Sequence, residues 1–302
     1  MSDFSIIRRS LRWLAGRGVF NWMPDEPYLK LKYWACMGKR LNLRDPKTFN
    51  EKIQWLKLHD RKPEYTIMVD KYEAKKYVAD RIGEEYIIPT LGVWDRFDDI
   101  DFSKLPEQFV LKCTHDSGGL SICRDKATFD IDSAREKINR SLKRKYFLQS
   151  REWPYKDVKP RIIAEQYMED RSTQELRDYK FFCFDGVAKA LFIASDRQKR
   201  GEDTKFDFYD IEFRHLPFTN GHPNADVNPQ KPKKFQEMIQ LAEKLATGFP
   251  HLRVDFYEVN GVAYFGELTF SHWSGFQPFV PEEWDTTFGN WIKLPDNFGE
   301  AN

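Results

Sequence analysis

The chain has 302 residues, of which 41% are hydrophobic and 16% aromatic, so it can bury a substantial core in one large or two medium domains. Its 48 basic and 47 acidic side chains nearly cancel, which argues against a dedicated nucleic-acid-binding protein, because such proteins usually carry a basic excess. The four cysteines show neither CxxC spacing nor a small secreted framework, so we expect reduced thiols and a cytoplasmic location.

The N-terminal segment combines arginines with apolar residues. Four arginines interrupt residues 6–17, so the segment lacks the unbroken apolar core of a signal peptide: Arg8, Arg9, Arg12 and Arg17. No run in the chain is long enough to span a bilayer. The pattern fits a short amphipathic helix, either packed on the domain or lying on an anionic membrane surface. Packing on the domain is the more common outcome, and peripheral attachment to the inner face of the cytoplasmic membrane stays open.

Helices are predicted in four places along the rest of the chain. Thr48 and Glu51 form a capping-box pattern, in which each side chain satisfies a free backbone donor of the first turn, so a helix begins there. Helical patterns also cover residues 64–81, 133–144 and 235–246, the last with a clear apolar stripe.

Apolar runs predict strands between these helices. Strand signals occur at residues 86–94, 109–114, 161–168, 179–184 and 188–194. The last two are joined by Asp185–Gly186, which favours a tight hairpin turn. Residues 197–230 are polar, contain a short aromatic strand near 206–213, and are the best candidate for a mobile or substrate-facing loop. This order of elements indicates an α+β protein with antiparallel sheets.

Near the C-terminus, two apolar-rich runs flank Asn260–Gly261, a pair that favours a two-residue hairpin turn. Each run carries one acid, so Asp255 and Glu267 are expected to face each other. Two carboxylates in apolar surroundings need compensation, which suggests a hard metal ion that prefers oxygen ligands. The alternative is an edge hairpin whose acids are simply solvated on its outer face.

Three cationic side chains also lie in strand-like runs. Lys112 lies in Phe109–Thr114 and precedes a Ser-Gly-Gly turn whose backbone amides suit a phosphate. Lys180 shares a strand face with Asp178, and Arg253 shares one with Asp255, which it can hold with two hydrogen bonds. A lysine extending from a strand edge and an ordinary cross-strand salt bridge are the simpler readings of these patterns.

Several familiar kinds of site are excluded by the sequence. The chain has no GxxxxGK[ST] and no GxGxxG after a strand. Its six histidines show no HExxH or paired zinc spacing, and no GxSxG elbow is present. We therefore expect neither a P-loop protein nor a zinc enzyme nor a serine acyl transferase.

Five segments together resemble the TupA-like ATP-grasp family: Val69–Tyr72, Phe109–Gly119, Ile163–Tyr167, Asp178–Gly186 and the hairpin from Val254 to Phe270. The similarity extends over roughly residues 48–295. It implies an ATP-grasp fold, in which two α+β subdomains with antiparallel sheets enclose ATP and an acid pair binds Mg²⁺. The implied organisation is a helical segment at 1–63 and an ATP-grasp domain at 64–295, with a lid subdomain at about 90–165 and a metal-binding subdomain at about 166–295.

The resemblance also implies roles for individual residues. Lys112 corresponds to the strand lysine that contacts the α- and β-phosphates, and Ser117, Gly118 and Gly119 correspond to the flap over the triphosphate. The implied adenine linker is Glu165, Gln166, Tyr167 and Met168, with Glu169 or Asp170 at the ribose. Further phosphate contacts are implied for Lys71, Asp178 and Lys180, catalytic roles for Lys112, Lys180 and Arg253, and metal ligation for Asp255, Glu267 and Thr269.

Two positions depart from the family pattern. Thr269 stands where many ATP-grasp enzymes have Asn, and a hydroxyl is the weaker ligand, so the number of metal ions is open. His115–Asp116 places a carboxylate beside the flap, where it would repel a triphosphate unless a metal ion intervenes.

The resemblance implies an ATP-dependent carboxylate–amine ligase, which forms an acyl phosphate and then an amide. The association of the family with bacterial surface polysaccharides suggests an amino acid and a uronic acid or glycan acceptor as substrates. Residues expected at the mouth of the site are Arg197, Arg200, Trp273 and Trp284. The alternatives are a glycosyltransferase, although Asp98–Asp101 only approaches a DxD motif, an ATP-grasp sugar kinase, and a nucleotide-binding regulator without turnover.

Overall fold

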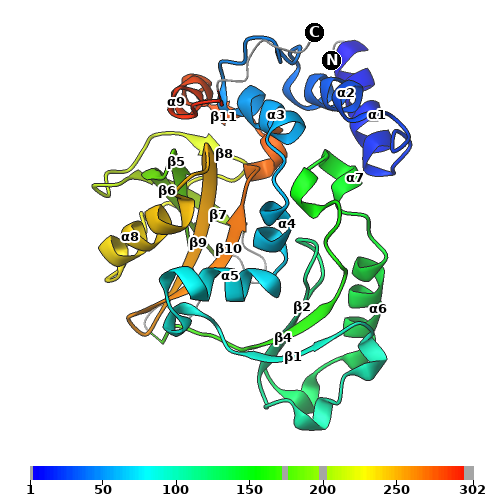
Figure 1. The fold of residues 1–302 in the computed structure, drawn as a ribbon, viewed down its shortest axis with the longest axis vertical. Coiled ribbons are helices and arrows are strands. Elements are labelled where there is room, and N and C mark those ends of the chain that lie inside the picture. Colours follow the sequence, from blue (N-terminus) through cyan, green and yellow to red (C-terminus); the bar gives the residue numbers. More distant parts are fainter. Residues whose placement is uncertain (1–2, 172–175, 197–202, 296–302) are drawn as a thin grey trace.

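A computed structural model of the chain describes residues 3–171, 176–196 and 203–295 (Figure 1). Its strands form a smaller and a larger sheet, and a separate two-stranded pair lies beside the larger one. Every pair of neighbouring strands is antiparallel. The predicted α+β class with antiparallel sheets is therefore confirmed.

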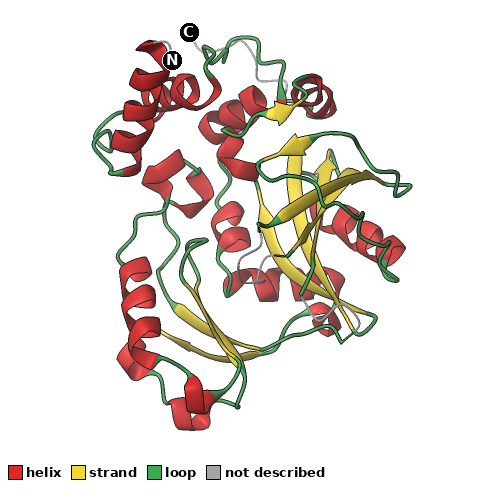
Figure 2. Cartoon of the chain, turned by 180° about the vertical axis from the view of Figure 1, so that it is seen from behind, coloured by secondary structure: helices red, strands yellow, loops and turns green. Residues whose placement is uncertain are grey.

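Helices dominate the N-terminal part of the chain: α1 (Asp3–Gly16), α2 (Asp25–Met37), α3 (Phe49–His59), α4 (Glu64–Val69) and α5 (Glu73–Ile82). The capping box is present, because the Thr48 hydroxyl accepts from the Glu51 amide and the Glu51 carboxylate accepts from the Thr48 amide. The α1–α2 pair lies at one end of the molecule, with α1 outermost in both views (Figure 2).

The single helix predicted over residues 64–81 is wrong, because the chain breaks between α4 and α5. Asp70 ends α4, and its carboxylate accepts from the amides of Tyr72 and Glu73, which begin the next helix. At the break, the Lys71 amide donates to the carbonyl of Thr114. The interruption thus fixes Lys71 against the smaller sheet.

The smaller sheet has the strand order β1-β4-β2-β3. Its elements are β1 (Thr90–Trp94), β2 (Phe109–Cys113), β3 (Leu120–Cys123) and β4 (Ile162–Gln166), with α6 (Ile131–Leu142) and α7 (Phe147–Ser150) between β3 and β4. Alternate residues of β2, such as Phe109 and Leu111, pack with Ile138 of α6 in a core of their own. Lys112 is thereby placed on the opposite face.

The larger sheet has the order β10-β9-β5-β6-β7. It comprises β5 (Asp178–Phe184), β6 (Val187–Ser195), β7 (Lys205–Asp210), β9 (His251–Val259) and β10 (Val262–Thr269). The remaining regular elements are β8 (Thr219–Asn220), α8 (Phe235–Ala246), β11 (Phe279–Val280) and α9 (Glu283–Trp291). Short 3₁₀ helices lie at Glu84–Tyr86, Phe97–Asp99, Phe102–Lys104, Lys126–Thr128, Trp153–Tyr155 and His272–Gly275.

Strand β5 is buried on both faces. Phe181 packs into a core shared with α5 and α8, whereas Phe182 packs into a second core with Phe49 of α3 and Phe288 of α9. Asp178 and Lys180 share the Phe182 face by alternation. The charged residues of this strand therefore lie on a covered part of the sheet, which is costly unless they are paired.

Candidate active site

The charged residues of the larger sheet form one row across three strands. Lys180 of β5 lies opposite Asp255 of β9, which in turn lies opposite Glu267 of β10. The β9–β10 ladder shifts register between Phe265 and Glu267, so Gly266 is an extra residue in a β-bulge. Regular pairing outward from the turn would have put Gly266 opposite Asp255 and turned Glu267 to the apolar face. The bulge therefore keeps the two acids together.

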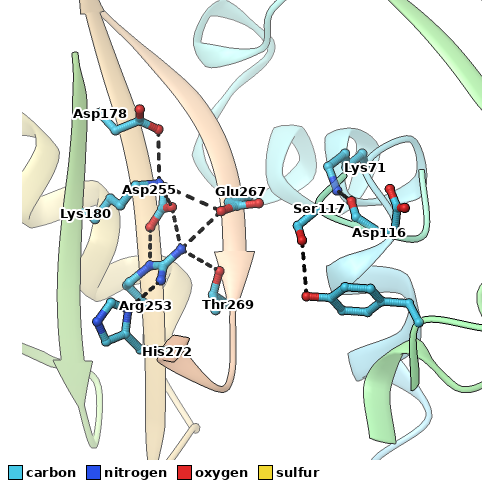
Figure 3. A network of polar contacts seen from close by, with 11 residues as sticks. Lys71, Asp116, Ser117, Asp178, Lys180, Arg253, Asp255, Glu267, Thr269 and His272 are labelled. Atoms are coloured by element: carbon cyan, nitrogen blue, oxygen red, sulfur yellow. Dashed lines mark hydrogen bonds and ion pairs between the residues drawn. The ribbon is translucent and has the colours of Figure 1, made fainter. Parts of the chain in front are cut away.

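Arg253 connects the members of this row (Figure 3). Its Nε lies 2.7 Å from Oδ1 of Asp255 and its Nη2 lies 2.8 Å from Oδ2, which is the two-bond arrangement predicted from their spacing. The same Nη2 lies 3.1 Å from Oε1 of Glu267 and 3.0 Å from Oγ1 of Thr269. Its Nη1 lies 2.8 Å from Nδ1 of His272.

Lys180 makes the second set of ion pairs in the row. Its Nζ pairs with Asp255, lies 3.0 Å from Oδ1 of Asp178, and lies 3.8 Å from Oε1 of Glu267. The Asp255 side chain is only 1% exposed, whereas that of Glu267 is 37% exposed. Glu267 is therefore the acid of the pair that opens toward solvent.

The ionisation of this cluster follows from burial and charge. Burial alone would raise the pKa of Glu267, but Lys180, Arg253 and Lys71 outweigh it and hold that pKa well below its ordinary value. Burial lowers the pKa of His272 well below its ordinary value, and Arg253 adds to the effect. Glu267 is consequently an anion at neutral pH, and His272 is a neutral acceptor for Arg253.

The smaller sheet contributes a second ion-pair group. The carboxylate of Glu165 pairs with Lys112 and lies 2.6 Å from Nζ of Lys75. Burial would raise the pKa of Glu165, yet Lys112 and Lys75 lower it to about 2. Glu165 is thus the counter-ion that holds both lysines on one side of the cleft.

The flap residues have an arrangement that the sequence did not predict. The Gly118 and Gly119 amides both donate to Oδ1 of Asp116, at 3.2 and 3.0 Å, so they are not directed at the cleft as expected. The Asp116 carboxylate is buried, accepts from the Ser141 hydroxyl and lies 3.8 Å from Nη1 of Arg144, so its charge is engaged within the protein. The Ser117 hydroxyl lies 3.4 Å from the Tyr146 hydroxyl, and Lys71 donates to the Asp116 carbonyl.

These groups converge on one cleft between the two sheets. Its lining includes Lys71, Lys75, Lys112, Asp116, Ser117, Gly119, Glu165, Asp178, Lys180 and Glu267. A more apolar pocket shares Lys112, Leu120, Glu165 and Tyr257 with this cleft and continues past Gln166, Tyr167 and Met168. A charged region and an apolar region thus form one continuous site.

The other predicted residues lie apart from this cleft. Asp170 accepts at 2.6 Å from the Asn260 amide and so supports the turn between β9 and β10. Trp284 stacks on Phe218 at 4.7 Å and is a packing residue, contrary to the prediction, whereas Trp273 is 41% exposed. Arg197 and Arg200 lie outside the described residues.

The structure also places residues at or beside the cleft for which the sequence predicts no role. Lys75 lines the cleft from α5, although its pattern in the sequence indicates only a helix. Tyr146 lies beside the cleft, where it contacts Ser117, and it has no local motif because this contact joins residues 29 apart in the chain. The exposed acids Asp98 and Asp101 pair with Arg135 and cap a 3₁₀ helix, so they form no part of the cleft.

The family resemblance implies that the acids of the row bind Mg²⁺. Among the described residues, no group of three or more His, Cys, Asp or Glu side chains could hold a metal ion alone. Glu267 fits, because it is anionic and open to the cleft, whereas Asp255 and Thr269 are engaged by Arg253. One open carboxylate suits Mg²⁺ that takes its remaining ligands from phosphates and water.

The chain is similar to one protein family and to several solved structures. The model of the family "TupA-like ATPgrasp" matches residues 51–293. No curated protein matches the chain. Similar solved structures include the D-alanine–D-alanine ligase of Bacillus anthracis complexed with ATP, at 16% identity and a TM-score of 0.40, with 68% of this chain and 55% of that chain covered. The D-alanine–D-alanine ligase of Helicobacter pylori shows 14% identity and a TM-score of 0.40, with 82% of this chain and 69% of that chain covered.

A third similar structure is the ATP-grasp ligase PsnB with a minimal precursor, Mg and ADP, at 9% identity and a TM-score of 0.39. The matched region covers 74% of this chain and 57% of PsnB. The chain thus spans little more than half of the first and third of these proteins. Because the family model covers most of the chain, the protein belongs to the TupA-like ATP-grasp family and has the ATP-grasp fold.

Proposed function

We propose that the protein is an ATP-dependent carboxylate–amine ligase that joins an amino acid to a uronic acid of a bacterial capsule or related surface polysaccharide. The observation that supports this most is the meeting of Lys71, Lys112 and Lys180 with the anionic Glu267 around one cleft. Cations from separate elements, together with one open carboxylate, suit a polyphosphate that brings a divalent ion. The amino acid and the uronic acid follow from the family resemblance alone.

ATP and Mg²⁺ are the cofactors of this proposed enzyme. The adenine occupies the apolar pocket beside Gln166, Tyr167 and Met168, while the phosphates extend toward Lys180. Lys71 and Lys112 bind phosphate oxygens from the other side, with Ser117 at the flap. The proposal keeps the expected lid subdomain at about 90–165 and metal-binding subdomain at about 166–295.

In this proposal a substrate carboxylate attacks the γ-phosphorus of ATP, ADP leaves, and an acyl phosphate forms. The substrate amine then attacks the acyl carbon, so the new C–N bond replaces the bond to phosphate, and the products are an amide, ADP and phosphate. Mg²⁺ supplies Lewis-acid charge at the transferring phosphoryl group when bound. Lys180 and Arg253 stabilise the same charge, and Asp255 holds both in position by the contacts described.

The proposed location is the cytoplasm, at the inner face of the membrane where the N-terminal basic segment attaches. The structure contains no helix, in the described part of the chain, that is long and apolar enough to cross a membrane.

Turnover with defined acceptors tests the ligase. Purified protein is incubated with Mg²⁺-ATP, uronic acid acceptors and an amino acid pool, and ADP release and product mass are followed. ADP together with an amide mass is the expected result. ADP with a phosphorylated sugar would identify a kinase instead, and consumption of a nucleotide sugar without ATP would identify a glycosyltransferase.

A further inference from the structure

The N-terminal helix α1 leaves an unusual face uncovered. Trp13 is 55% exposed and Trp22, in the turn that follows the helix, is 79% exposed. Five of the sixteen large apolar side chains that are exposed in the described part of the chain lie between Ile6 and Trp22, so they are concentrated in this short segment. Tryptophans rarely remain this exposed on a surface that contacts only water.

The same segment concentrates positive charge. Between Asp3 and Asp25 the chain has four arginines and no acid, although the whole chain carries a net charge of only +1. Ile6, Arg9 and Trp13 are spaced at three and four residues, so they lie along one side of α1. The Arg17 guanidinium lies 3.5 Å above the Trp13 ring. The exposed face is therefore both apolar and cationic.

The opposite side of α1 is fixed to the protein. Arg8 donates to the carbonyls of Ala35 and Cys36, at 3.3 and 3.1 Å, at the end of α2. Buried Arg151 donates to the carbonyls of Phe20, Asn21 and Met23 in the turn that carries Trp22. The face is thus presented by an anchored helix pair at one end of the molecule (Figures 1 and 2).

We propose that this outer face of α1, with the turn to Trp22, is a docking surface for an anionic lipid membrane. The Trp13 and Trp22 rings enter the interface between head groups and acyl chains, where their amphipathic rings are favoured. Arg9 and Arg17 pair with lipid phosphates. The charge of the face favours this occupant, because a second copy would place Arg9 and Arg17 against the same two arginines.

The proposal refines the location given above and is independent of the ligase chemistry. A membrane-bound enzyme of this kind would act on an acceptor carried by, or released at, the lipid surface. Arg151 fixes the docking face to the segment that carries Tyr146, which contacts Ser117 of the cleft, so docking would hold the cleft in a defined orientation.

Flotation of the full-length protein with vesicles tests the proposal. Vesicles of phosphatidylcholine with about one third phosphatidylglycerol are expected to bind the protein at least tenfold more tightly than phosphatidylcholine alone, and high salt should weaken that binding. The double variant Trp13→Ser/Trp22→Ser should lose at least tenfold in binding, and Arg9→Gln/Arg17→Gln should lose about fivefold for each arginine. Matched controls elsewhere on the surface, Ile211→Ser and Arg96→Gln/Lys104→Gln, should bind like the wild type.

Circular dichroism and thermal unfolding establish that each variant is folded before its binding is compared. Absence of wild-type binding to the anionic vesicles, or equal binding by the tryptophan variant, would overturn the proposal. If the wild type does not bind vesicles, and light scattering shows a wild-type dimer that the tryptophan variant does not form, the face contacts a second copy. That result would also overturn the membrane proposal. ADP release in detergent-free buffer is measured separately, so failure of docking and failure of the ligase proposal give different results.

Discussion

Arg253 holds Asp255 through two hydrogen bonds from a position two residues earlier in the same strand, with Nε–Oδ1 and Nη2–Oδ2 distances of 2.7 and 2.8 Å. The pair is buried, and the same guanidinium reaches Glu267 and Thr269 on the neighbouring strand. Asp255 thus acts in this structure chiefly as the group that orients two cations. Of the two acids, Glu267 is the one that lines the cleft.

The first prediction concerns this ion pair. Arg253→Ala leaves a buried carboxylate without its main partner, so the free energy of unfolding should fall by about 3–5 kcal/mol, as measured by urea denaturation. Adding Asp255→Asn removes the carboxylate that has lost its guanidinium partner and should restore part of the loss. A single variant that unfolds within about 1 kcal/mol of the wild type would show that the pair contributes little to stability.

The second prediction concerns the cleft. Lys112→Ala and Glu267→Ala should each lower turnover at least about 100-fold, because both groups face the proposed triphosphate and metal ion. In Lys112→Ala, Lys75 still pairs with Glu165, so the melting temperature of this variant should differ from that of the wild type by less than about 5 °C. The exposed Lys104, which pairs with Asp101 on the surface, supplies the control variant Lys104→Ala. Wild-type turnover in either cleft variant would contradict the assignment.

Much of this site was predictable because its signals are local. The Asn260–Gly261 pair gave the hairpin, and the spacing of Arg253 and Asp255 gave their shared face. The helix over residues 235–246 was predicted with the bounds that the structure has, because its apolar stripe is regular. Local turn chemistry and side-chain periodicity are the features that a sequence expresses most directly.

The features that were missed depend on contacts between distant residues. The buried position of Asp116 depends on Ser141, which lies 25 residues later in the chain. The break at Asp70 depends partly on its ion pair with Arg161, at 2.8 Å and 91 residues away. Gly266 was a usable signal, because an isolated glycine in a strand often marks a bulge. The prediction of a regular two-residue hairpin did not include this bulge.

The third prediction tests the bulge at Gly266. A Cβ at this position would meet the Asp255 carbonyl oxygen at 3.1 Å and Tyr257 at 3.2 Å, so the neighbouring strand must move by a few tenths of an ångström. Gly266→Ala should cost about 1–3 kcal/mol of stability and lower turnover about tenfold, because Glu267 moves with the strand. Gly16→Ala, where a Cβ meets nothing within 4 Å, is the matched control and should alter neither property. Unchanged turnover of Gly266→Ala would mean that the position of Glu267 tolerates this movement.

The fourth prediction concerns acid stability. The pKa of Glu165 is about 2 in the folded protein and about 4.5 when unfolded, so its ionised form stabilises the fold by about 3 kcal/mol above pH 4.5. Because the folded pKa is the lower one, this contribution is lost as the pH falls from about 4.5 toward 2. Glu165→Gln should therefore be less stable than the wild type at pH 7, and the difference should shrink on acidification through this range. Urea denaturation at pH 7, 5, 4 and 3 measures the difference in the free energy of unfolding between Glu165→Gln and the wild type. The substitution Glu107→Gln, at an exposed position, is the control. A difference that stays constant with pH would show that the two lysines do not hold Glu165 as an anion.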